Sequence, residues 1–151
     1  MWQRTSLAMA GFGLALLALG LACPLQADEG GSNLPFKGVA EGTVTGIAPS
    51  GAVVVESTGT ATYLGDFTRT EYVFFGPDGE ISGTVVFTAA NGDQLEADFS
   101  GGFTSPTTAE GTYTFTGGTG RFSDATGTAS FQAITPDGVH VAVSFKGSIS
   151  Y

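Results

Sequence analysis

The sequence contains few of the residues that metal, redox or nucleic-acid chemistry requires. Among 151 residues it has one cysteine, one histidine and 5 basic residues against 14 acidic ones. Nucleic-acid binding is disfavoured because phosphate contacts need clustered lysine and arginine. Aspartate and asparagine oxygens lack the spacing of a calcium loop, and His140 falls beside a turn on a polar face, away from any positioned serine. We therefore expect no metal, no cofactor and no Ser-His-Asp relay.

The first 27 residues have the features of an export signal. One charge, Arg4, precedes an apolar run from Leu7 to Ala22, and Ala27 offers a small residue for cleavage. The run is too short for a comfortable membrane span. We expect cleavage after Ala27 and a secreted or periplasmic protein. Removing this leader takes away one basic residue and no acidic one, so the formal net charge changes from −9 to −10.

An alternative cleavage site precedes Cys23. Residues 19–23 resemble a lipoprotein signal, in which this cysteine would carry a lipid and attach the protein to a membrane. Gly20 stands where a larger aliphatic residue is usual, which favours the soluble form. Cleavage after Ala27 would leave the mature chain without a thiol, and disulfides and thiolate chemistry would then be excluded.

Beyond Ser32 no stretch has helical periodicity, and short alternating runs are separated by Gly, Pro, Asn and Asp. We expect a flexible N-terminal segment over residues 28–35 and one all-β domain over residues 36–151. Eight strands are predicted: Phe36–Ile47, Val53–Leu64, Asp66–Phe75, Ile81–Ala89, Leu95–Gly102, Gly111–Thr116, Gly127–Ile134 and Val139–Tyr151.

Four connections share one form, a three-residue loop that ends in glycine: Pro49-Ser50-Gly51, Pro77-Asp78-Gly79, Ala90-Asn91-Gly92 and Pro136-Asp137-Gly138. This pattern is typical of hairpins made by a type I turn and a glycine bulge. It predicts the pairs 47 with 53, 75 with 81, 87 with 95 and 133 with 141.

Because paired residues share a face of the sheet, these turns place the odd-numbered residues on one side. That set is largely apolar and includes Val39, Ile47, Phe75, Phe87 and Phe145, whereas the even set is mostly Thr, Ser, Glu and Asp. One apolar face shared by all hairpins indicates a single enclosed core. A meander that closes on itself removes exposed edges, so we predict an eight-stranded antiparallel up-and-down β-barrel.

A glycine-rich segment, residues 117–127, separates the sixth and seventh predicted strands. It lacks the third glycine of a dinucleotide motif and no helix follows it. We expect a tight structural loop that depends on Gly117, Gly118 and Gly120, with Phe122 plugging one end of the barrel.

The run from Gly117 to Phe122, followed by Ala125 and Gly127, resembles the signature loop of the allene oxide cyclase and dirigent families. Residues 61–68 and 87–93 are similar to segments of secreted bacterial proteins of undefined role. The resemblance covers residues 36–151 and implies an eight-stranded, calycin-type barrel. It also implies that small apolar molecules are held or cyclised inside the barrel, but it assigns no site residue.

Three charges fall on the odd face: Glu41, Arg69 and Glu71. An unpaired buried carboxylate is costly, so Arg69 should pair with one or both acids. The hydroxyls of Tyr63, Tyr113 and Ser57 could complete a polar, ligand-binding centre. Its predicted members are Glu41, Arg69, Glu71, Tyr63, Tyr113 and Ser57. One carboxyl with a raised pKa could act as an acid. The alternative is a purely structural ion pair near the mouth of the barrel.

The favoured function is binding of a small apolar ligand without catalysis. A cyclase or isomerase using Glu41, Glu71 or Arg69 is an alternative. Two further alternatives are a structural envelope protein with a filled interior and a small outer-membrane barrel whose odd-numbered residues face lipid. Three apolar residues on the even face suggest contact between copies of the chain: Tyr72, Phe74 and Val86.

Overall fold

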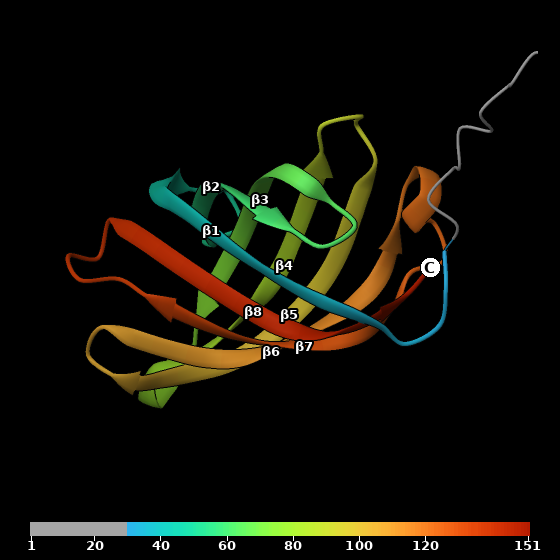
Figure 1. The fold of residues 1–151 in the computed structure, drawn as a ribbon. Coiled ribbons are helices and arrows are strands. Elements are labelled where there is room, and N and C mark those ends of the chain that lie inside the picture. The colour runs from blue at the N-terminus through green and yellow to red at the C-terminus, as the bar shows by residue number, and fades with distance from the viewer. Residues whose placement is uncertain (1–29) are drawn as a thin grey trace, which may run out of the picture.

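The computed structural model of the protein describes residues 30–151, so the expected leader and both cleavage alternatives lie outside the described residues. Eight antiparallel strands pair in chain order, and β8 pairs with β1 to close the barrel (Figure 1). This confirms the predicted fold class. The strands are β1 Leu34–Ile47, β2 Val53–Ala61, β3 Gly65–Phe75, β4 Glu80–Ala89, β5 Gln94–Ser105, β6 Thr108–Gly118, β7 Thr126–Ile134 and β8 His140–Ser150. Two single turns of 3-10 helix interrupt them, η1 Pro77–Gly79 and η2 Gly120–Phe122.

Three of the four predicted hairpin registers are confirmed, namely 47 with 53, 75 with 81 and 87 with 95. The fourth is wrong by two residues, because Ala133 pairs with Val143. In this hairpin the backbone groups beside the turn bond outside the hairpin. The N–H of Thr135 donates to the carbonyl of Thr107 in the β5–β6 turn, and the carbonyl of Val139 accepts from the N–H of Val44 in β1. The shift is even, so the odd residues of β8 still face inward.

The predicted face of β1 is wrong over most of its length. The β1–β2 register shifts between Val44 and Gly46, which leaves Thr45 as an extra residue in β1. One extra residue reverses which side chains face inward. Before the bulge it is therefore Phe36 and Ala40 that are buried, whereas Val39 is 57% exposed.

The core fills the barrel with aromatic and aliphatic side chains. Phe87, Tyr113 and Phe145 lie at its centre, with ring centroids 5.6–6.0 Å apart and edge-to-face geometry. The apolar side chains thus face inward and the polar set faces outward, which is the reverse of what the outer-membrane alternative requires.

The two ends of the barrel differ. The chain termini of the described region, the 62–64 and 90–93 turns and η2 lie at one end, at the right of Figure 1, which Phe122 and Tyr151 close with ring centroids 5.0 Å apart. The other four hairpin turns lie at the opposite end (Figure 1). We call this the open end, because a cavity enters the barrel there. Within residues 30–151 no helix has the length and apolar character needed to cross a membrane.

Candidate ligand site inside the barrel

A buried ion pair lies between the aromatic core and the open end. Arg69 and Glu71 are two residues apart on β3, so both side chains point inward, and Nη2 of Arg69 donates a hydrogen bond to Oε2 of Glu71. Arg69 is 2% exposed and Glu71 is 6% exposed. The sequence predicts that Arg69 pairs with Glu41, Glu71 or both, and the structure shows the pair with Glu71.

The guanidinium of Arg69 also lies over two aromatic rings, 5.7 Å from the centroid of Phe87 and 5.8 Å from that of Tyr113. Such contacts stabilise a desolvated cation. Burial alone would lower the pKa of Arg69, but the charge of Glu71 and the hydrogen bond to Glu71 favour the cation, and the pKa is raised. The arginine is therefore charged.

Tyr113 presents a neutral phenol to the site. Burial has the largest effect and raises the pKa of Tyr113, the charge of Arg69 lowers it by less, and the Glu71 carboxylate raises it by the smallest amount. The hydroxyl can donate or accept a hydrogen bond, but it is a poor proton acceptor.

Several buried polar atoms of this cluster have no hydrogen-bond partner within the described chain: Arg69 Nε, Arg69 Nη1, Tyr113 Oη and Ser57 Oγ. Ser57 lies directly opposite Arg69 in the β2–β3 ladder. Buried polar groups are nearly always hydrogen-bonded, and leaving one unsatisfied costs about 1–3 kcal/mol. The cluster thus offers donors that the protein itself does not use.

A cavity of about 170 Å³ adjoins the pair at the open end. Arg69, Glu71 and Tyr113 form its polar floor. Its walls are mainly apolar, and its full lining is Val44, Val53, Val55, Arg69, Glu71, Val73, Phe75, Ile81, Phe103, Ala109, Tyr113, Phe131, Ala133, Thr135, Gly138 and Val141. Phe75 and Phe103 stand at the mouth with stacked rings, 6.3 Å between centroids.

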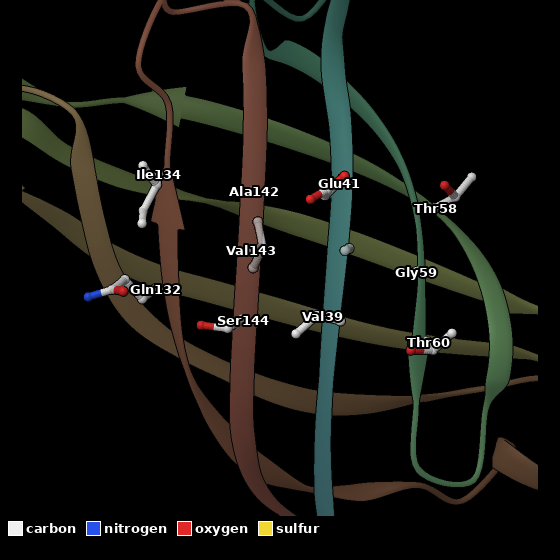
Figure 2. A pocket seen from close by; sticks show the side chains of 11 residues that line it. Val39, Glu41, Thr58, Gly59, Thr60, Gln132, Ile134, Ala142, Val143 and Ser144 are labelled. Atoms are coloured by element: carbon white, nitrogen blue, oxygen red, sulfur yellow. The ribbon is translucent and has the colours of Figure 1, made fainter.

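Two predicted members of the site lie elsewhere. Glu41 is exposed on the outer face of β1, because the bulge at Thr45 reverses the facing of that strand. Figure 2 shows it on the outside of the barrel beside Ala142. Tyr63 lies in the β2–β3 turn at the closed end, where its ring centroid is 5.7 Å from that of Tyr151. Both placements correct the prediction, whereas Arg69, Glu71, Tyr113 and Ser57 do lie together.

The glycine-rich loop belongs to the closed end and not to the cavity. Gly117, Gly118 and Gly120 all have positive φ, at 129°, 158° and 58°. Phe122 is fully buried, and its backbone N–H donates to the carbonyl of Thr119. Across residues 30–151 no three His, Cys, Asp or Glu side chains gather as a metal site would require.

Apart from Arg69, Glu71 and Tyr113, the sequence pattern assigns no residue of the cavity lining to a site. Phe103 lies beyond the predicted end of the fifth strand, and Val44 is on the face assigned to solvent. The stacked aromatic pair Phe75 and Phe103 belongs to strands that are not neighbours, so only three-dimensional placement reveals it.

Comparison with known proteins gives one informative result. No protein-family model and no curated protein matches the chain. Among solved structures, the chain is similar in fold to the pterocarpan synthase dirigent protein GePTS1, with a TM-score of 0.50 and 16% sequence identity over 80% of this chain and 94% of that chain. This likeness supports a dirigent-like barrel fold.

Proposed function

We propose that this protein is an exported barrel that binds a small, largely apolar molecule at the open end without transforming it. The observation that carries the proposal is the set of unsatisfied polar atoms on Arg69 and Tyr113 at the floor of an apolar cavity. Ligand sites combine apolar walls with a few convergent polar groups in this way.

The cavity limits the size of the ligand. An apolar cavity of about 150 Å³ is enough to hold benzene, so about 170 Å³ suits one ring or a short branched chain. Because Arg69 and Glu71 compensate each other, a neutral ligand with an oxygen acceptor fits better than an ion. A larger molecule would extend outward between Phe75 and Phe103.

The chemistry of the floor favours binding over catalysis. The carboxylate of Glu71 is engaged by Arg69, and the raised pKa of Tyr113 keeps its phenol neutral. His140 is the first residue of β8, and its side chain is 70% exposed and bonded to Asp137 in the β7–β8 turn. These groups can hold an oxygen atom, but they are not arranged as a general base.

Ligand-observed NMR with toluene, benzyl alcohol and benzaldehyde tests the proposal. We expect the two oxygenated compounds to bind more tightly than toluene, because they can accept hydrogen bonds from Arg69. Ala133→Leu, which fills the cavity from its wall, should abolish binding, and Ala90→Leu, in an exposed turn at the closed end, should not. Equal binding of all three compounds to the wild type and to Ala133→Leu would refute the proposal.

A cyclase or isomerase is the second candidate. It is favoured by the free N–H groups of Arg69, which could stabilise negative charge as it develops on a bound oxygen. The dirigent protein of similar fold is named a synthase, which is the reason to test for turnover. Mass spectrometry of a molecule that co-purifies with the protein, before and after incubation, would show whether it is changed.

A further inference from the structure

The two lysines of the chain form a single, unusual surface site. Lys37 on β1 and Lys146 on β8 lie directly opposite each other in the antiparallel ladder, on the outer face. Like charges in this position repel. Arg69 and Arg121 lie beside Glu71 and Asp93, whereas neither lysine has an ion-pair partner among residues 30–151. In so acidic a chain this arrangement leaves a concentrated positive site open to an anionic partner.

Apolar and hydroxyl side chains surround the lysines. Val39 and Ser144 form the next cross-strand pair along β1 and β8 and line the same shallow groove. Figure 2 shows the adjoining part of this surface, with Val39 on β1 between Ser144 of β8 and Thr60 of β2. We call Lys37, Lys146, Val39 and Ser144 the lysine face.

A second exposed surface has the complementary chemistry. Glu96 and Asp98 lie on the outer side of β5 and have no ion-pair partner in the described part of the chain. Val86 of β4 is directly opposite Glu96. Two exposed aromatic residues of β3 extend the patch, with Tyr72 38% and Phe74 44% exposed. We call Glu96, Asp98, Val86, Tyr72 and Phe74 the acid face.

The closed topology sets these two faces on opposite sides of the barrel. In one direction β2 separates β1 from β3, where the acid face begins, and in the other direction β6 and β7 separate β5 from β8. In Figure 1, β1 and β8 cross the front of the barrel, with β4 and β5 behind them. Complementary surfaces on opposite sides cannot satisfy each other in a two-fold dimer, and they generate an open, head-to-tail chain.

We infer that the lysine face of one copy binds the acid face of the next, so that the barrels associate head to tail into chains. The occupant of each face is thus a second copy of this protein. Charge complementarity selects the partner surface and its orientation, and burial of Val39, Phe74 and Val86 contributes the apolar part of the contact. Neither face lines the interior cavity, so this association does not depend on ligand binding.

Charge exchange between two variants tests the inference by sedimentation velocity. The first variant is Lys37→Glu/Lys146→Glu and the second is Glu96→Lys/Asp98→Lys. In each variant the lysine face and the acid face carry charge of the same sign and repel each other. We expect the dissociation constant for self-association to rise at least about tenfold relative to the wild type. An equimolar mixture of the two should form chains again, because every junction in it is complementary.

Two controls separate this contact from general charge and apolar effects. Asp78→Lys/Asp124→Lys changes the net charge as much as the second variant but alters exposed residues at the barrel ends, so it should associate as the wild type does. Phe74→Ser should weaken association, and Ile47→Ser, at a more exposed apolar site outside both faces, should not. A wild type that stays monomeric at every concentration, or forms only a closed dimer, would overturn the inference. So would a variant mixture that fails to recover.

Discussion

Replacing Glu71 by glutamine should destabilise the protein more than any surface change. The substitution keeps the shape of the side chain and removes the charge that compensates Arg69, which is 2% exposed. At an effective dielectric constant of about 20, two charges about 4 Å apart attract by about 4 kcal/mol. The amide oxygen of the glutamine can still accept a hydrogen bond from Arg69, which retains about 1 kcal/mol. The rings of Phe87 and Tyr113 contact the cation before and after the substitution and do not change the difference. The expected loss is therefore about 3 kcal/mol, in the range of other broken buried pairs.

Chemical denaturation at neutral pH measures this loss directly. At about 3 °C per kcal/mol for a domain of this size, the melting temperature should fall by about 10 °C. The double variant Arg69→Met/Glu71→Gln removes both charges and should recover most of the stability, because no buried charge is left unpaired. A loss below about 1 kcal/mol for the single variant, or a double variant that loses the sum of the two single effects, would refute this reasoning.

Two further predictions concern alkaline pH and turn geometry. The raised pKa of Tyr113 means that its phenol stays protonated in the folded state while it ionises near pH 10 when unfolded, so stability is lost as the pH rises above about 10. Tyr113→Phe should lose less stability over that range in pH-dependent unfolding. Gly138 has a φ of +74°, so Gly138→Ala should cost about 1–2 kcal/mol in chemical denaturation. Gly46→Ala, where a Cβ meets nothing within 4 Å and φ is not positive, is the matched control and should cost less.

The barrel could be predicted from the sequence because its turns are local. Each loop that ends in glycine determines the pairing register of its hairpin through a few local residues. The alternation of apolar and polar residues then places the same face inward in successive hairpins. Phe75 with Ile81 and Phe87 with Leu95 pair as those loops require. In the β7–β8 hairpin the backbone groups of Thr135 and Val139 form hydrogen bonds outside the hairpin, and there the register predicted from the local loop is wrong.

The site was only partly predictable for the same reason. Arg69 and Glu71 follow the alternation of β3 without interruption and are buried as a pair. Glu41 lies on the N-terminal side of the bulge at Thr45. Glycine within a strand often marks a bulge, and Gly46 does so here, but Gly38 and Gly42 of the same strand do not, so the sequence does not locate the bulge. Tyr63 turns away because residues 62–64 form the β2–β3 connection, where it has a φ of +66°.

Stability alone does not account for a buried Arg69–Glu71 pair. Replacing such a pair by apolar side chains of similar volume is often neutral or stabilising, and the rest of this interior is packed with aromatic and aliphatic groups. The pair also leaves two N–H groups of Arg69 unsatisfied, which is a further cost. The ion pair and the unsatisfied N–H groups of Arg69 both lie where the cavity meets the core. These groups destabilise the empty barrel, and a bound oxygen atom would accept their hydrogen bonds. The proposed function therefore explains why these polar side chains occupy a position that an all-apolar core would fill more stably.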